Sequence, residues 1–311
     1  MKTLTATSII ALVAFAGHAS AQDLTFAAGS LNGGHVAIEG DEIISFSLDG
    51  DFELTYDKFV FGGSAKHQNY DFDGGDELAV TTYDAFAAYA LSPEFMVGAG
   101  LTGIAVEDGS SFSGYEAFAQ YDNGQYAAAV VYEKPTNEND DFDLTSVFGQ
   151  AMLSPEVVVG AVIESVSVLE ETLYYLSADY ASGPISARGY YHGVTEIDAA
   201  IYGARGSYDF AQGFFATADL QRAEGFFGDG LETYAVGGGY HFNDTATIDA
   251  SIGQMSVNNF DATVFQIGLT FEMGGRKRVD SVMSDAVRAD LSSGLSLFAP
   301  DYGFGAGINF Y

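Results

Sequence analysis

The sequence predicts an all-β protein, a closed antiparallel transmembrane β-barrel of about 16 strands with short turns at one end and longer loops at the other. Three observations predict this fold. The composition is rich in Gly (38 residues), Phe (25) and Tyr (19), which is typical of strands and turns. Turn signals recur at fairly even intervals along the chain. Tyrosines repeat six residues apart on strand faces that are otherwise apolar.

Charge and cysteine usage exclude several classes of protein. The 311 residues include 43 acidic and 11 basic side chains, so the formal net charge is −32 and no nucleic acid partner is expected. Because the chain has no Cys, disulfide scaffolds, cysteine-based zinc or iron–sulfur sites and thiol nucleophiles are excluded. An apolar fraction of 48% argues against disorder. The chain can therefore fold as one large architecture.

The first residues have the pattern of a secretory signal peptide. Lys2 supplies the positive charge, residues 9–16 (IIALVAFA) supply the apolar core, and Ala19-Ser20-Ala21 forms the cleavage site. An N-terminal membrane anchor is the alternative, but the apolar run is shorter than the roughly 18 residues that a spanning helix needs. We expect residues 1–21 to be removed and residues 22–311 to form a single transmembrane barrel domain.

Turn signals divide the rest of the chain into repeating units. The tight turns are Asp49-Gly50-Asp51, LSPE at 91–94 and 153–156, Asp122-Asn123-Gly124, Ser182-Gly183-Pro184, Ala211-Gln212-Gly213 and Asn243-Asp244-Thr245. Longer polar connections lie midway between them, at 67–77 (HQNYDFDGGDE), 106–111 (VEDGSS), 135–141 (PTNENDD) and 224–230 (EGFFGDG). Each unit is therefore strand, long loop, strand and tight turn. A β-solenoid or a propeller would share such a period, so the strand faces decide between these folds.

Nearly every predicted strand has one apolar face and one mixed face. In 263–272, Phe265, Ile267 and Leu269 share one face, while Gln266 and Thr270 share the other. The strand at 113–121 follows the same rule except that Phe118 falls on the polar face. A soluble β-sandwich would also alternate in this way, because two sheets can pack their apolar faces together. The position of the tyrosines argues against that alternative.

Six pairs of tyrosines predict an aromatic girdle at each membrane interface. Six residues span about 20 Å of strand, which a tilt of roughly 40° reduces to about 15 Å of membrane height. Amphipathic phenol rings suit both headgroup levels, with small apolar residues between them. The pairs are Tyr83 and Tyr89, Tyr115 and Tyr121, Tyr126 and Tyr132, Tyr174 and Tyr180, Tyr202 and Tyr208, and Tyr234 and Tyr240.

From its signal peptide to its aromatic terminus, the chain resembles the Gram-negative outer-membrane porins, and most closely the alphaproteobacterial general porins of the Rhodobacter type. The resemblance implies periplasmic turns, extracellular loops, and an outer membrane whose lipid and lipopolysaccharide surround the barrel. It also implies a homotrimer and a water-filled channel for ions and small hydrophilic solutes. The turns give fifteen strands between Asp41 and Met273, and one within 23–38 makes sixteen, with both ends on the tight-turn side. A count of 18 is the alternative.

The C-terminal part of the chain does not follow the strand pattern. Residues 274–301 separate the strand that ends at Met273 from a last predicted strand at 301–311 (DYGFGAGINFY), in which Tyr311 is one residue out of step. Helical spacing predicts a short amphipathic helix within this insertion, on Val279, Val282, Met283, Ala286 and Val287. The segment could be a surface anchor or a plug of the lumen, but an ordinary connector helix is the preferred interpretation.

Strand parity assigns a set of charged side chains to the lumen, where pore size and charge decide what passes. The acidic members are Asp84, Glu116, Glu164, Asp179, Asp249 and Glu272, and the basic members are Arg188 and Arg205. Lys66 joins the basic members if a bulge near Asp57 and Lys58 resets the alternation. In the porins that the chain resembles, a basic wall faces an acidic loop folded inward. Arg188 and Arg205 match that wall in kind, although simple pairing with lumen carboxylates is the alternative. Residues 106–111 and 135–141 are both candidates for the inward loop.

These features predict a passive diffusion channel with a moderate preference for cations, because the acidic surplus surrounds the path of any ion. A closed structural or adhesive barrel is the first alternative, favoured if residues 274–301 fill the bore. A soluble secreted β-protein is the second alternative. The five His, at positions 18, 35, 67, 192 and 241, lie near no hydrolase or nucleotide motif, so no enzyme is predicted.

A calcium site is the only cofactor that the sequence suggests, and the channel does not require it. Asp71, Asp73, Asp76 and Glu77 crowd one loop around a Gly-Gly turn, and carboxylate oxygens are the ligands that Ca²⁺ prefers. The spacing is not that of an EF-hand. A solvated acidic loop is the alternative.

Overall fold

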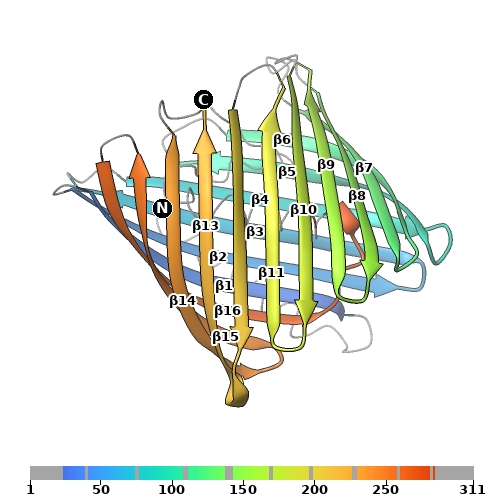
Figure 1. The fold of residues 1–311 in the computed structure, drawn as a ribbon. Helices are drawn as coiled ribbons and strands as arrows, with labels where there is room; N and C mark the ends of the chain where they lie inside the picture. Colours follow the sequence, from blue (N-terminus) through green and yellow to red (C-terminus); the bar gives the residue numbers. More distant parts are fainter. Residues whose placement is uncertain are drawn as a thin grey trace.

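The protein is a closed barrel of sixteen antiparallel strands, as predicted (Figure 1). The computed structural model describes residues 24–283, except 39–40, 74–76, 108–110, 137–142, 168–170, 196–198, 226–229, 258–259 and 281–282. The predicted signal peptide and the predicted last strand at 301–311 lie outside the described residues. No helix among the described residues is long and apolar enough to cross a membrane.

The strands follow one another around the barrel in chain order, and β1 pairs with β16 to close it. Closure leaves no sheet edge with unpaired backbone groups, which is the condition for strands in hydrocarbon. The strands are β1 (Leu24–Ile38), β2 (Asp41–Tyr56), β3 (Phe59–Phe72), β4 (Glu77–Ala90), β5 (Phe95–Val106), β6 (Ser111–Asp122), β7 (Tyr126–Pro135), β8 (Leu144–Ser154), β9 (Val157–Val166), β10 (Glu171–Ser182), β11 (Ile185–Val194), β12 (Ala199–Asp209), β13 (Phe214–Glu224), β14 (Leu231–Asn243), β15 (Ala246–Val257) and β16 (Phe260–Gly274).

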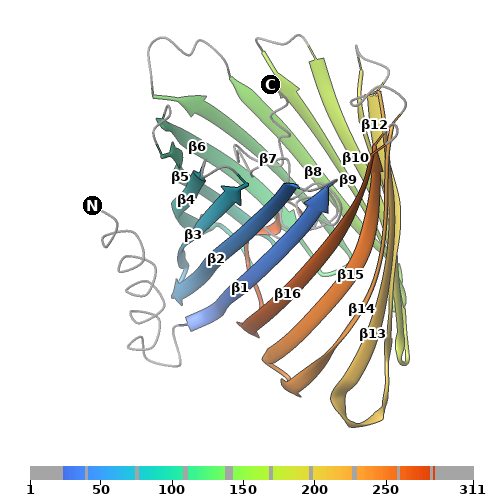
Figure 2. The same ribbon diagram turned by 90° about the vertical axis from the view of Figure 1, so that its left-hand side faces the viewer.

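Both ends of the barrel lie on the tight-turn side, as predicted, since β1 starts and β16 ends there (Figure 2). Gly275 N–H donates to the Thr25 carbonyl at 3.0 Å, which extends the closing pair by one bond. The turns use the expected chemistry. In the β6–β7 turn Gly124 has φ +82, and the Asn123 side chain accepts hydrogen bonds from the backbone N–H groups of Gln125 and Tyr126.

Two boundaries predicted from local signals are wrong. Asp49-Gly50-Asp51 is not a turn, because β2 runs through it and the alternation continues: both aspartates face the lumen and Gly50 faces outward. The turn comes at Asp57-Lys58 instead, where Asp57 has φ +54. The predicted long loop at 67–77 is also too long, since β3 continues to Phe72. In both places polar residues within a strand have the composition of a turn.

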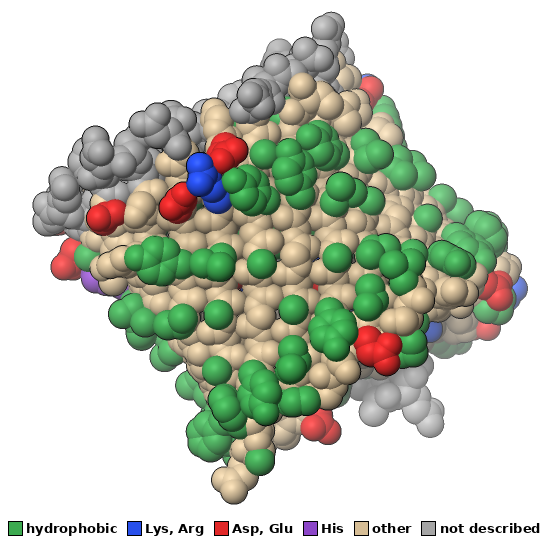
Figure 3. All heavy atoms as spheres, in the orientation of Figure 1, with side chains coloured by type: hydrophobic (Ala, Val, Ile, Leu, Met, Phe, Trp, Pro, Cys, Tyr) green, Lys and Arg blue, Asp and Glu red, His purple; other side chains and the backbone are tan. Residues whose placement is uncertain are grey.

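The outer face of the barrel is apolar. Large hydrophobic side chains lie exposed along its strands, including Phe265, Ile267, Leu269 and Phe271 at 44–45% exposure, and Figure 3 shows such side chains spread over one side of the barrel. In water such a surface would be an aggregation hazard, whereas in lipid it is the expected contact surface. The exposed apolar band therefore contradicts the soluble β-protein and fits a transmembrane barrel.

The inner face differs with height. Near the loop end, inward side chains are buried on all sides of the barrel, for example Val36 on β1, Ile201 on β12, Leu231 on β14 and Val264 on β16. At mid-height the wall formed by β4–β9 stays buried, whereas the opposite wall opens onto a cavity. Toward the tight-turn end β1–β3 are buried again, at Phe26, Glu53 and Val60. The lumen therefore has a packed side and an open side.

Candidate functional site

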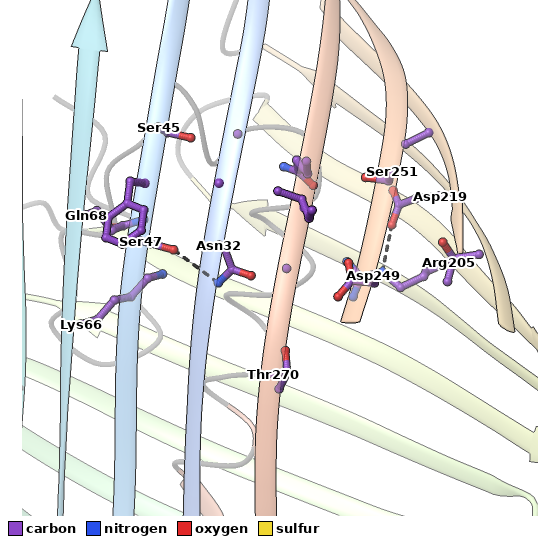
Figure 4. A pocket seen from close by; sticks show the side chains of 18 of the residues that line it. Asn32, Ser45, Ser47, Lys66, Gln68, Arg205, Asp219, Asp249, Ser251 and Thr270 are labelled. Carbon is purple, nitrogen blue, oxygen red and sulfur yellow. Dashed lines mark hydrogen bonds and ion pairs between the residues drawn. The ribbon is translucent and has the colours of Figure 1, made fainter. Parts of the chain in front are cut away.

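The open side of the lumen holds a polar cavity of about 500 Å³, lined by residues of β1–β3 and β12–β16 (Figure 4). Its wall carries hydroxyl, amide and charged side chains that alternate with the lipid-facing residues of the same strands. These include Asn32, Lys66, Arg205, Asp219, Asp249 and Ser251. A solute in this cavity meets donors, acceptors and both signs of charge.

Two basic residues reach the cavity from different walls. Lys66 projects from β3, where it lies opposite Asp49 of β2 in the strand register. Arg205 projects from β12 and donates through Nε to the Asp219 carboxylate at 2.9 Å. Figure 4 shows the two side chains on opposite sides of the same space. The cavity thus has a cation on each flank, and at least Arg205 is compensated by a neighbouring carboxylate.

Arg188 belongs to a row of four charges that crosses four strands. In the register Asp179, Arg188, Arg205 and Asp219 are successive neighbours on β10 to β13. Arg188 donates to Asp179 at 2.8 Å and to the Tyr175 hydroxyl at 2.7 Å. The two arginines predicted as a basic wall are therefore adjacent, and each forms an ion pair with a lumen carboxylate. Their field is local, because the row as a whole is neutral.

The predicted lumen acids occupy two different environments. Asp249 lines the cavity, Asp84 accepts a hydrogen bond from Ser64, and Glu272 is exposed near the tight-turn end. Glu164 is only 2% exposed and accepts a hydrogen bond from Ser146 at 3.0 Å. Glu116 is also buried, in the cluster described below. These last two carboxylates are inward but do not meet lumen water.

The twelve tyrosines lie on the outer face. Eight are exposed by 37–59%: Tyr83, Tyr89, Tyr115, Tyr126, Tyr132, Tyr180, Tyr208 and Tyr234. The other four pack against outward rings, Tyr121 on Phe95, Tyr174 and Tyr202 on either side of Tyr191, and Tyr240 on Phe214. Phenylalanines join the ring at the tight-turn end, where Phe210 packs on Tyr208 and Phe59 on Tyr89. Tyrosine spacing alone did not indicate them.

The residues that sequence reasoning missed lie just beyond β16. Residues 276–280 and Met283, here called the anchor segment, contact inward side chains of the barrel wall. Arg276 pairs with Asp51 of β2 at 3.0 Å, and Arg278 pairs with Glu116 of β6 at 2.7 Å. Val279 and Asp280 have helical backbone and are buried. Of the three interpretations of this insertion, the described contacts fit the one inside the lumen.

Arg278 remains charged in this setting. Burial opposes a charged guanidinium, but Asp280 and Glu116 more than offset burial and raise the pKa of Arg278 above its usual value. The guanidinium also lies between two rings, 4.3 Å from the centroid of Phe118 and 4.8 Å from that of Phe86. Phe118, the exception to the alternation in its strand, therefore has a partner inside the barrel.

The acidic residues proposed to bind calcium are only partly within the described chain. Asp71 lies in β3 opposite Glu77 of β4, Asp73 donates its N–H to the Glu42 carbonyl, and Asp76 lies outside the described residues. Among the residues that the structure does describe, no three acidic or histidine side chains are arranged to hold a metal ion. The calcium site stays a prediction.

Comparisons with known proteins support the fold. No protein-family model and no curated protein sequence matches the chain. A mutant of the Rhodopseudomonas blastica porin is similar in structure, with a TM-score of 0.55 and 14% identity over 80% of this chain and 100% of that one. OccK5 (OpdH) of Pseudomonas aeruginosa gives 0.53 and 11%, over 81% and 99%. A bacterial polysaccharide outer membrane secretin gives 0.50 and 12%, over 79% and 98%.

The fold is therefore that of the outer-membrane porins, as the resemblance in the sequence predicted. The closed sixteen-strand barrel and its apolar outer face are those of a multi-pass protein of an outer membrane.

Proposed function

We propose that the protein is an outer-membrane porin, a channel for the passive diffusion of ions and small hydrophilic solutes with a moderate preference for cations. The observation that carries this proposal is the polar cavity inside a closed barrel whose outer face is apolar. Hydroxyl, amide and charged groups at that position have no role in packing against lipid. They are suited to replace part of the hydration shell of a passing solute.

The preference for cations follows from the distribution of charge. Of the 43 acidic residues only four follow Gly275, which leaves 39 in the barrel strands and loops against six basic residues. Such a surface concentrates cations and repels anions within a Debye length of about 8 Å at physiological salt. Arg188 and Arg205 do not cancel this effect, because Asp179 and Asp219 neutralise them locally.

No catalytic role is proposed. His192 is buried among lumen side chains, and His241 lies at the tight-turn end of the barrel against Phe215, with rings 4.7 Å apart. Within the part of the chain that the structure describes, neither is placed with a serine and a carboxylate in the geometry that a hydrolase requires. Contacts with lipopolysaccharide and assembly as a homotrimer are proposed by analogy with the fold alone.

Planar-bilayer recording tests the proposal. The purified barrel should produce stepwise conductance in symmetric KCl, and a KCl gradient should give a reversal potential of the sign for cation selectivity. The selectivity should weaken as total salt rises, because screening shortens the reach of the acidic surface. An anion-selective potential would show that local basic groups outweigh the total charge.

A closed barrel with a structural or adhesive role is the second candidate. It is favoured by the burial of inward side chains near the loop end, on strands as far apart as β1, β9 and β14. The same recording decides between the two. Absence of conductance from a barrel shown to be folded by its heat-resistant migration would favour the closed barrel.

A further inference from the structure

The anchor segment follows the lumen wall near the tight-turn end. It starts beside β1 and β2, where Arg276 lies over the Phe26 ring at 4.5 Å from the centroid and pairs with Asp51. It then contacts β4 and β6 through Arg278. Met283 reaches β9, where its Cε would lie 3.3 Å from a Cβ added at Gly160. The segment therefore crosses the inner wall from one side of the barrel to the other.

Arg278 fixes the segment to the wall. Its guanidinium donates to both oxygens of Glu116, at 2.7 and 2.8 Å, and to both oxygens of Asp280, at 2.7 to 3.1 Å. The barrel leaves space for these partners: a Cβ at Gly98 or Gly100 of β5 would collide with Phe118 or with the Glu116 carboxylate. A buried guanidinium that satisfies two carboxylates in this way allows a single position of the chain.

The backbone of the segment is held as well. The Glu53 carboxylate accepts hydrogen bonds from the N–H groups of Lys277 and Arg278, at 2.6 and 3.3 Å. The Gln120 amide donates to the Lys277 carbonyl at 2.6 Å and accepts from the Val279 N–H at 3.0 Å. These bonds do not involve the Lys277 side chain. A substitution at position 277 should therefore leave the backbone in place.

Lys277 is the exposed cation of the segment. Arg276 and Arg278 are each compensated by carboxylates, whereas the Lys277 ammonium makes no ion pair with any residue that the structure describes. It lies between two residues bound to the inner wall, at the tight-turn end of the lumen.

We propose that the anchor segment forms the constriction of the channel at its tight-turn end, fixed by Arg278, and that Lys277 is a residue that determines ion selectivity. The proposal rests on the proposed function, since a constriction matters only in a conducting barrel. It differs from a constriction made by a loop between two strands, because the chain that narrows the pore comes from beyond the closing strand. In this arrangement Lys277 restrains the cation preference that the acidic surface produces.

Charge substitutions at position 277 test the proposal. One uncompensated unit charge about 8 Å from the ion path changes the local ion concentration about twofold in water. Lys277→Gln should therefore raise the cation-to-anion permeability ratio about twofold, and Lys277→Glu about fourfold. Lys58→Gln is the matched control, since it removes the same charge from the tight-turn end but lies on the outer face, 5.9 Å from the Tyr89 ring centroid. That variant should keep the wild-type ratio.

The double variant Glu116→Gln/Arg278→Gln tests the fixation of the segment. Without the ion pair the segment should lose its single position, and the unit conductance should rise or become heterogeneous. If the double variant does not assemble, the Lys277 substitutions still test whether the anchor segment forms the constriction, because those changes leave the buried contacts intact. If the wild type conducts but Lys277→Gln and Lys277→Glu both keep its reversal potential, the proposal that this segment forms the constriction would be wrong. If neither the wild type nor any folded variant gives a measurable conductance, the proposed channel function itself would be wrong.

Discussion

The two sides of the lumen show how one strand pattern can produce either a wet wall or a packed wall. On β1–β3 and β12–β16 many inward residues at mid-height are polar or charged, and they line the cavity. On β4–β9 the inward residues include Phe86, Phe118 and Phe148, all buried. On both sides neighbouring strands pair antiparallel and the outer face is apolar. The difference lies in the inward residues and in the anchor segment, which starts beside β1 and β2 and packs on β4, β6 and β9.

Burial changes what an ion pair contributes on each side. Arg278 and Glu116 have side chains about 5% exposed, so their pairing compensates two desolvated charges. The side chains of Arg205 and Asp219 are 34% and 15% exposed, so water partly solvates both charges and their pairing contributes less to stability. The predictions that follow use this contrast, from the largest expected effect to the smallest.

Removing one partner of a pair should separate the two sides most clearly. Arg278→Gln should destabilise the barrel by about 3–5 kcal/mol, because it leaves the buried carboxylates of Glu116 and Asp280 without their cation. Asp219→Asn breaks the same type of pair on the cavity side and should cost less than about 1 kcal/mol. Urea unfolding in detergent, followed by heat-resistant migration, measures both. Equal losses would contradict the division into a packed and an open side.

A new arginine should be tolerated on the inner face of the open side and not on the outer face. Ile252→Arg, in the middle of β15, places a cation in lipid and should cost about 2–4 kcal/mol near the midplane. Ser251→Arg, the preceding residue on the same strand, points into the cavity and should assemble normally. The yield of folded barrel in outer membranes measures the difference. If both variants assembled equally, the assignment of strand faces would be wrong.

Replacing both arginines of the charged row should sharpen the selectivity of the open side. Arg188→Gln/Arg205→Gln leaves Asp179 and Asp219 uncompensated, so the cation-to-anion permeability ratio should rise about twofold or more. Reversal potentials across a KCl gradient measure the change. An unchanged potential would place this row outside the permeation path.

The smallest effect is expected from calcium. If Asp71, Asp73, Asp76 and Glu77 bind Ca²⁺ in the folded barrel, millimolar Ca²⁺ should raise the unfolding temperature by a few degrees through linkage. A variant with all four residues changed to Asn or Gln should lose that rise. A wild-type barrel indifferent to Ca²⁺ would remove this site from consideration.

Much of the fold could be predicted because strand alternation and turn spacing are local signals. The strand count, the closure and the outward tyrosines all follow from a period of two residues. The wrong turn assignments concern residue types that occur both in tight turns and on the lumen face of a strand. Asp49 and Asp51 flank a glycine as turn residues do, yet in β2 they are lumen-facing side chains. Nothing local distinguishes these two uses.

The anchor segment could not be predicted, because its contacts join residues more than 150 positions apart, such as Arg278 and Glu116. Two signals did point toward it. Phe118 breaks the alternation of its strand, and three consecutive basic residues, Arg276 to Arg278, follow the closing strand of a chain that has only 11 in total. Each signal alone has ordinary explanations. Only the folded chain shows that the two belong together.

Single-cysteine labelling is the most direct test of the division of the lumen, because the chain has no native Cys. Ser251→Cys lines the cavity, whereas Ala129→Cys is inward but buried in the packed side at 2% exposure. A charged, water-soluble thiol reagent added to a conducting bilayer should reduce the current through the Ser251→Cys barrel and leave the Ala129→Cys barrel unchanged. A block at Ala129→Cys without any effect at Ser251→Cys would contradict the account, since the ions would then pass along the side described here as packed.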